Sequence, residues 1–158
     1  MSEVTVVELS PQLVLGMRRK GAYREIAVML PRVFEFAFSK NVQIAGYPVF
    51  LCHEITHAEV QKADKDENAD IEVAVPISGS VEITGNEEIR EYELHGGKMA
   101  RIVHKGPYEE CSPTYKKLFS LIAEKGKRIV GPIREIYFND PREVTSDEIL
   151  AKIYAPLD

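Results

Sequence analysis

The sequence predicts an α+β fold with one antiparallel sheet, both helices on one side of it, and two strand–helix–strand–strand repeats with pseudo-two-fold symmetry. Two observations predict this fold. Apolar residues change from the two-residue period of strands to helical spacing and back, twice along the chain. The order of segments also recurs. Because neither copy alone could bury both its helix stripe and its sheet face, we expect a single domain over residues 1–158, with repeats at about 1–78 and 86–158.

The recurrence consists of matches at a constant offset of 85 positions without a gap. The last strands match at an offset of 80, the difference being loop length. A single constant offset over so long a stretch is hard to obtain by chance, so the sequence predicts an internal duplication. The matched residues include Lys20–Tyr23 with Lys105–Tyr108, Glu8-Leu9 with Glu93-Leu94, Val33-Phe34 with Leu118-Phe119, and Ile71–Pro76 with Ala151–Pro156.

The elements of the first copy follow from composition and period. A β-branched run ends at a Ser-Pro turn signal, and the next strand has a possible bulge at Gly16. Apolar residues at helical spacing, interrupted by Pro31, indicate a helix. A polar, charged stretch then indicates an exposed hairpin loop. The alternation of apolar residues after it indicates a further strand. The expected elements are strands Val4–Leu9 and Gln12–Arg19, a helix from Ile26 to Lys40, strand Tyr47–Cys52, loop His57–Ala69 and strand Asp70–Ile77.

The second copy is clearest between His104 and Pro141. Its pattern predicts a strand end, a tight Gly106-Pro107 turn, a helix and a final strand. Ser112 is a suitable N-cap for this helix, and Gly126 ends it. The side chains predicted to form its buried stripe are Tyr115, Leu118, Phe119 and Ile122, so Tyr115 is interpreted as an ordinary core aromatic.

The composition excludes several classes of protein. Hydrophobic content of 44% and charged content of 28% are ordinary for a soluble globular chain. A net charge of −5 argues against direct nucleic-acid binding, which normally needs a basic face. No signal peptide and no membrane span is apparent. Cys52 and Cys111 lie far apart and form no C-x-x-C motif. We therefore expect a cytoplasmic protein without membrane contact.

The most conspicuous motif is His-Glu-x-x-His at His53–His57, the pattern of zinc metallopeptidases. That chemistry needs a helix, because the spacing of four residues directs both imidazoles to one metal only there. The motif here follows a predicted strand, and no third ligand is apparent, although Glu72 stays possible. We interpret it as a coincidental match and expect neither a metal nor another cofactor.

Glu135 is the most interesting titratable residue, because it interrupts the apolar pattern of a strand. It could be a solvent-facing strand residue, as most glutamates are. Its counterpart in the first copy is Phe50, which favours a position facing the interior or a groove. A carboxylate desolvated there would have a raised pKa unless a cation or a hydrogen bond compensates.

The chain has seven tyrosines and no tryptophan. Most tyrosines are interpreted as core or rim residues. Tyr23 and Tyr108, however, occupy equivalent positions at the two helix entrances and could flank a groove between the copies. Each cation–π contact with such a ring would contribute about 0.5–2 kcal/mol, so several contacts are needed for micromolar affinity.

With these residues in view, the chain resembles the GyrI-like small-molecule-binding family, which includes effector-binding domains of MerR- and AraC-type multidrug-responsive regulators. The likeness covers essentially the whole chain. The segments that carry it are the H-x-G-P-Y turn at His104–Tyr108, the helix to Gly126, the G-P-x-x-E-x-Y-x-N-D-P stretch at Gly131–Pro141 and the ending at Glu148–Leu157.

The resemblance implies a cleft between the repeats that accepts hydrophobic, often cationic, compounds. The family's central pocket acid maps onto Glu135. Two departures are the missing tryptophan of the second helix region and the missing helix-turn-helix segment, so we expect a stand-alone sensor domain. Counting the residue-based candidates as well, the predicted ligand-binding residues are Glu135, Tyr137, Tyr108, Tyr23, Phe50, Tyr47 and Tyr154.

Three functions stay open at this stage. The first is a cytoplasmic binder of hydrophobic cations or aromatic compounds. The second is a GyrI-like hydrolase of reactive small molecules in which Glu135 and Tyr108 act as base and acid. The third is an interaction with a protein partner such as gyrase or a separate DNA-binding protein, through the acidic surface.

Overall fold

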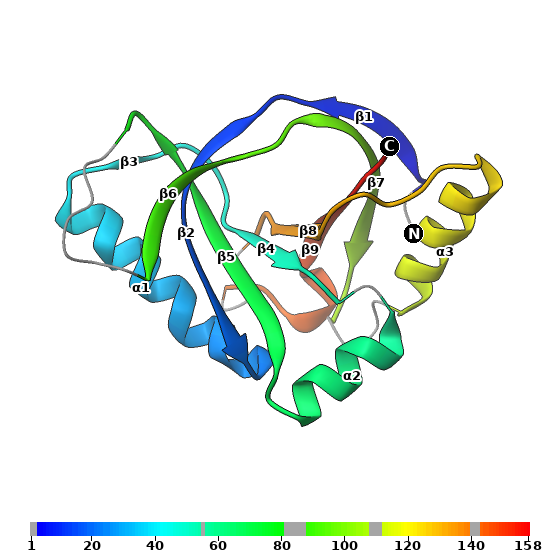
Figure 1. Ribbon diagram of the computed structural model, residues 1–158, viewed down its shortest axis with the longest axis horizontal. Helices are drawn as coiled ribbons and strands as arrows, with labels where there is room; N and C mark the ends of the chain where they lie inside the picture. Colours follow the sequence, from blue (N-terminus) through cyan, green and yellow to red (C-terminus); the bar gives the residue numbers. More distant parts are fainter. Residues whose placement is uncertain (1–2, 55, 81–87, 108–111, 140–142) are drawn as a thin grey trace. The chain divides into compact units, whose positions relative to one another are not determined.

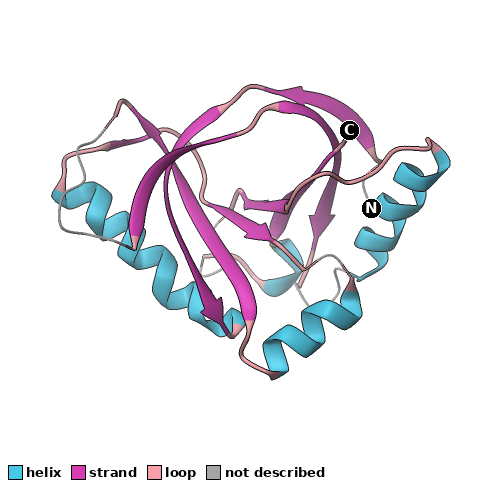
Figure 2. Cartoon of the chain, in the orientation of Figure 1, coloured by secondary structure: helices cyan, strands magenta, loops and turns pink. Residues whose placement is uncertain are grey.

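The computed structural model describes residues 3–54, 56–80, 88–107, 112–139 and 143–158 (Figure 1). The chain divides into two compact units. The central unit is Pro11–His95, and the terminal unit is Met1–Ser10 together with Gly96–Asp158. Helices and antiparallel strands are present in both units, which confirms the α+β class (Figure 2). Within the described residues, no helix is long and apolar enough to cross a membrane.

The central unit is an antiparallel sheet with strand order β6-β2-β5-β4, and β3 pairs with the end of β5. Helix α1 packs on β2 and β5, and α2 contacts β5. The elements are β2 (Gln12–Gly21), the 3-10 turn η1 (Tyr23–Glu25), α1 (Ile26–Ser39), β3 (Gln43–Ile44), β4 (Val49–Cys52), α2 (His57–Lys65), β5 (Ala69–Ser78) and β6 (Ile89–Leu94).

The terminal unit is an antiparallel sheet with strand order β1-β7-β9-β8, and helix α3 packs on β7. Its elements are β1 (Thr5–Leu9), β7 (Gly97–Lys105), α3 (Ser112–Glu124), β8 (Ile133–Tyr137), the 3-10 turn η3 (Ser146–Glu148) and β9 (Leu150–Pro156).

The pairing registers of the two units correspond at the offsets found in the sequence. Leu9 pairs with Gly97 in the terminal unit, and Leu94 pairs with Gln12 in the central unit. Phe50 pairs with Val73, and their counterparts Glu135 and Ile153 pair in the same way. Each unit therefore contains the first strand of the other predicted repeat. The register supports the predicted duplication, which itself stays a prediction.

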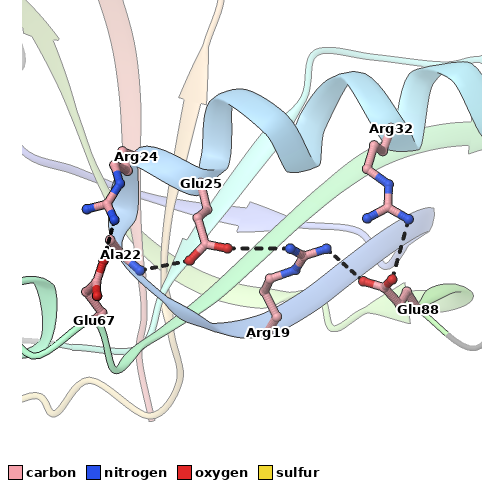
Figure 3. A network of polar contacts seen from close by, with 7 residues as sticks. All are labelled: Arg19, Ala22, Arg24, Glu25, Arg32, Glu67 and Glu88. Carbon is pink, nitrogen blue, oxygen red and sulfur yellow. Dashed lines mark hydrogen bonds and ion pairs between the residues drawn. The ribbon is translucent and has the colours of Figure 1, made fainter.

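The central core lies between α1 and one face of the sheet. Leu15 and Met17 on β2 are buried and pair with β5. Arg19 continues the same face, because side chains two residues apart on a strand point the same way. It contacts Glu25 and Glu88, and Glu88 in turn contacts Arg32 on α1, as Figure 3 shows. This chain of contacts identifies the helix-covered face of the sheet.

The start of α1 is held by the carboxylate of Glu25. Its Oε2 accepts a hydrogen bond of 3.0 Å from the backbone N–H of Ala22, and its Oε1 lies 3.4 Å from Nη1 of Arg19 (Figure 3). The carboxylate rests directly on Gly21, where a Cβ atom would lie 1.7 Å from Oε2. A side chain at position 21 would therefore displace the Glu25 carboxylate.

Two sequence predictions for the central unit are wrong. Residues 57–65, interpreted as part of an exposed hairpin loop, form helix α2, which Thr56 caps by accepting a hydrogen bond from the N–H of Glu59 at 3.1 Å. The helix is mostly polar, so apolar period could not reveal it. Gly16 is not a bulge, because it pairs in regular register with both neighbouring strands. It is a glycine because the ring of Tyr92 lies over it.

Candidate functional site

The carboxylate of Glu135 lies inside the terminal unit, between its sheet and helix α3. Glu135 is the third residue of β8, pairs with Ile153 on β9 and is 1% exposed. From α3, the hydroxyl of Tyr115 donates a hydrogen bond of 2.5 Å to its Oε2. Of the two readings that the sequence left open for Glu135, the solvent-facing strand residue is thereby excluded.

The electrostatic state of this carboxylate is set mainly by burial. Burial raises the pKa of Glu135 to about 7, and hydrogen bonding to Tyr115 and Tyr137 opposes that rise. Its Oε1 has no solvent exposure and no hydrogen-bond partner of good geometry in the described part of the chain. A buried acid with one unsatisfied oxygen and a pKa near neutrality can bind a cation or transfer a proton.

Sequence reasoning missed the role of Tyr115. The sequence predicts Tyr115 on the buried stripe of α3 as apolar packing alone, whereas the helix buries Thr114, Leu118 and Ile122 and leaves Tyr115 half-buried with its hydroxyl on Glu135. The signal that could have identified it is geometric: the stripe faces the strand that carries Glu135, and a buried tyrosine hydroxyl needs a partner. Tyr137, predicted from the family resemblance, is half-buried and interacts with Glu135.

The remaining predicted ligand-binding residues are Tyr154 in the terminal unit, three residues of the central unit and Tyr108. Tyr154 is buried on β9 but belongs to the opposite face of the sheet, since it adjoins Ile153 in sequence. In the central unit, Tyr23 and Phe50 form an edge-on ring pair with centroids 6.1 Å apart, and Tyr47 is 57% exposed. Tyr108 lies outside the described residues.

The imidazole of His104 connects the end of β7 to the start of α3. It is buried, with Nδ1 2.8 Å from Oγ1 of Thr114 and Nε2 3.0 Å from the carbonyl oxygen of Pro107. Because a carbonyl can only accept, Nε2 carries the proton and Nδ1 accepts from the Thr114 hydroxyl. The imidazole thus links Pro107, which follows β7, to Thr114 on α3.

The His-Glu-x-x-His match spans the connection between β4 and α2 rather than a single helix. His53 and Glu54 follow β4, and His57 is the first residue of α2. The Nε2 atom of His53 lies 2.8 Å from Oε1 of Glu72. No group of three or more histidine, cysteine, aspartate or glutamate side chains within the described ranges could hold a metal ion. The two histidines therefore do not lie on one helix, as the zinc motif requires.

Glu72 is a second buried carboxylate, on β5 of the central unit, and both of its oxygens have partners. Oε1 contacts His53, and Oε2 accepts a hydrogen bond of 2.6 Å from the Tyr92 hydroxyl. Burial alone would raise the pKa of Glu72, but hydrogen bonds from His53 and Tyr92 together hold it below its usual value. The charged form is therefore stabilised by the protein itself.

The comparisons with known proteins identify the class of this domain. A profile of the GyrI-like small molecule binding domain matches residues 2–158. The chain therefore belongs to the GyrI-like small-molecule-binding family, as the resemblance had implied. A search of the curated proteins gives no match.

Solved structures share the fold at low sequence identity. The EcmrR C-terminal domain aligns with a TM-score of 0.82 at 18% identity, covering 100% of this chain and 98% of that one. In the EcmrR–DNA complex the TM-score is 0.81 at 18% identity, with 99% of this chain covered; this chain spans 57% of that longer one. A hydrolase encoded by lin2189 from Listeria innocua aligns with a TM-score of 0.72 at 13% identity, covering 99% of this chain and 92% of that one. SAV2435 bound to tetraphenylphosphonium aligns with a TM-score of 0.58 at 13% identity, covering 99% of this chain and 94% of that one.

Proposed function

We propose that this protein binds hydrophobic organic cations, and that Glu135 is the acid that recognises their charge. The observation that carries the proposal is a fully buried carboxylate with one oxygen held by Tyr115 and the other without a hydrogen-bond partner of good geometry among the described residues. Such a group is costly to ionise alone, and a bound cation would supply the missing charge. Family membership gives the ligand class as a small molecule.

The chemistry around Glu135 favours a cation that is aromatic or otherwise apolar. Tyr115 and Tyr137 place rings beside the carboxylate, and Phe119 lies against Tyr115 with centroids 5.8 Å apart. A delocalised cation has a weak hydration shell, so it loses little on leaving water and gains contact with these rings. SAV2435, a protein of similar fold, is bound to tetraphenylphosphonium, which is a cation of this kind.

The biological setting that we propose is effector binding for transcription regulation. EcmrR, whose C-terminal domain has a similar fold, forms a complex with DNA. A cytoplasmic sensor of cations could act through a DNA-binding protein in the same way. The described residues offer no observation that favours gyrase as the partner.

A thermal-shift and calorimetric titration tests the proposal. The probe is tetraphenylphosphonium, and triphenylphosphine oxide is the neutral aromatic comparison. We expect the cation alone to bind the wild type, and Glu135→Gln to weaken its binding at least about tenfold, the effect of losing one charge-assisted contact. Glu124→Gln, which removes an exposed carboxylate at the end of α3, is the matched control and should bind normally. Equal binding by wild type and Glu135→Gln would exclude the pocket acid.

A second candidate function is hydrolysis of an electrophilic small molecule. The observation that favours it is the 2.5 Å contact between the Tyr115 hydroxyl and a carboxylate whose pKa is about 7, which suits general acid–base catalysis at neutral pH. An enzyme should form product from an epoxide panel and lose turnover, more than affinity, in Glu135→Gln and Tyr115→Phe. A binder gives no product with any variant.

A further inference from the structure

The face of the terminal sheet that points away from Glu135 carries three cationic side chains around one tyrosine. Arg101 on β7 and Arg134 on β8 both pair with Tyr154 on β9. Directly paired residues of antiparallel strands share a face, so the two guanidinium groups flank Tyr154 on the same side. Lys152, two residues before Tyr154, joins this face. We call these four residues the cationic face.

Burial makes the cationic face unusual. Arg134 and Tyr154 are each 8% exposed, and arginine is mostly exposed in folded proteins. The Nε atom of Arg101 has no solvent exposure and no hydrogen-bond partner among the residues that the structure describes. In the part of the chain that the structure describes, no carboxylate lies within ion-pair distance of Arg101. A buried donor without an acceptor is unfavourable, and an anion from outside the chain would satisfy it.

The central unit shows that the fold does not require these arginines. Its register-equivalent positions carry Gly16 in place of Arg101 and Val49 in place of Arg134. Both positions pair within a regular sheet. Because the same strand geometry forms there without any guanidinium group, the two arginines of the terminal unit need an explanation other than strand pairing.

We propose that the cationic face binds an oxyanion, as a carboxylate or phosphate group carried by a small aromatic molecule. Guanidinium groups present planar pairs of donors that match these anions. The ring of Tyr154 between the two arginines would support a flat apolar body. Lys152, whose Nζ atom lies 4.8 Å from the centroid of the Phe138 ring, adds positive charge at the edge. The site selects the charge opposite to that of the Glu135 site, on the other face of one sheet.

Isothermal titration calorimetry with benzoate, phenyl phosphate and benzyl alcohol tests the site. We expect at least one of the two anions to bind the wild type and the neutral alcohol not to bind. Arg101→Gln should weaken anion binding at least about tenfold, as expected for the loss of a charge-assisted hydrogen bond. The control Lys98→Gln makes the same charge change at an exposed position of β7 and should leave binding unchanged. The preferred probe distinguishes a carboxylate site from a phosphate site.

Further variants keep the test decisive if Arg101→Gln folds poorly, which unfolding in urea would reveal. Arg101→Lys keeps the charge but loses the planar fork, so we expect intermediate binding. Arg134→Val installs the residue of the central unit and should also weaken binding. Glu135→Gln should bind both anions like the wild type, so the two proposals fail separately. Absence of anion binding by the wild type, or equal weakening in Lys98→Gln, overturns the site.

Discussion

The two compact units share strand registers but place their buried carboxylates on opposite faces of the sheet. In the terminal unit the acid is Glu135, beneath helix α3, where the central unit has Phe50. In the central unit the acid is Glu72, two residues along β5 from Ala74, where the terminal unit has Lys152. The backbone geometry is therefore common to both units, and the chemistry at equivalent positions differs.

The comparison also shows what decides the charge of a buried acid. Both glutamates are almost fully removed from solvent. Glu72 has hydrogen bonds on both oxygens and a lowered pKa, whereas Glu135 has an unsatisfied oxygen and a pKa raised to about 7. Burial raises the pKa of both acids, but for Glu72 the electrostatic effects of His53 and Arg18 add to its hydrogen bonds, whereas Glu135 has hydrogen bonding from tyrosines alone. A buried carboxylate without a cationic neighbour is the one suited to an external cation.

The largest expected effect is a loss of stability when a glutamate is placed in the central unit at the position equivalent to Glu135. Phe50→Glu would bury a carboxylate where Leu30, not a tyrosine, occupies the position equivalent to Tyr115. With no hydroxyl donor from the helix, the uncompensated charge should destabilise the protein by about 3–5 kcal/mol. Urea unfolding at pH 7 measures it. The reciprocal Glu135→Phe should fold without such a loss, and a cost below about 1 kcal/mol for Phe50→Glu would contradict the role given to Tyr115.

The second effect is a pH-dependent gain in stability for Glu135→Gln. Because the folded-state pKa is raised from 4.5 to about 7, the folded protein binds the proton more tightly, and stability falls as pH rises between these values. Glutamine does not titrate, so it should stabilise the protein by roughly 3 kcal/mol at most at pH 8 and little at pH 4. Urea unfolding at both pH values, with Glu124→Gln as control, checks the sign. A gain that grows toward acid pH would refute the assignment.

A smaller effect of opposite pH sign is expected for the Glu72 cluster. Tyr92→Phe removes one of the two donors and should cost about 1–2 kcal/mol at pH 7. Since the pKa of Glu72 is lowered, its contribution is present above the unfolded-state pKa and is lost as pH falls through the folded-state value. The difference between wild type and Tyr92→Phe should therefore shrink in acid. Tyr47→Phe, at an exposed tyrosine, should show no difference at either pH.

The smallest effects distinguish two matched glycines. Gly21 is the last residue of β2, and its counterpart Gly106 directly follows β7. Gly106 has φ of 119°, where side chains are strained, whereas Gly21 accommodates the Glu25 carboxylate. Gly21→Ala should cost about 1 kcal/mol through loss of the Glu25 contacts. In a double variant with Glu25→Gln the two costs should not add, because both remove the same contacts. Gly106→Ala combined with Glu25→Gln should be additive.

Much of the fold could be predicted because it depends on the spacing of apolar residues and on the recurrence of the same segments in the two copies. The strands and the helices α1 and α3 have clear apolar patterns, and the offset between copies places most of them twice. Helix α2 escaped prediction because it is stabilised by a cap at Thr56 and by contact with β5, not by an apolar stripe. The same limit explains Gly16, because the ring that lies over it belongs to Tyr92 on β6, a neighbouring strand that is far away in the sequence.

The candidate site could be predicted only in part. Glu135 was identifiable because a charged residue interrupted an apolar strand at a position where the other copy has phenylalanine. Tyr115 was not, because a tyrosine on a buried stripe gives no sign of which polar group it meets. Tyr154 was predicted from the family pattern, but strand parity places it on the other face from Glu135. Pairwise contacts of this kind depend on register, which the sequence alone does not fix.

The exchange of first strands between the predicted repeats has a consequence for how the protein can be divided. Strand β1 completes the sheet of the terminal unit, and β6 completes that of the central unit. A half-length chain cut near residue 86 would keep β1 but lose β6, leaving β2 with a bare edge open to aggregation. In a pair of such chains, β1 of each could take the place of β6 beside β2 of the other. An isolated half should therefore persist only as an intertwined homodimer. The short joints at Ser10-Pro11 and His95-Gly96 make that exchange internal to one polypeptide.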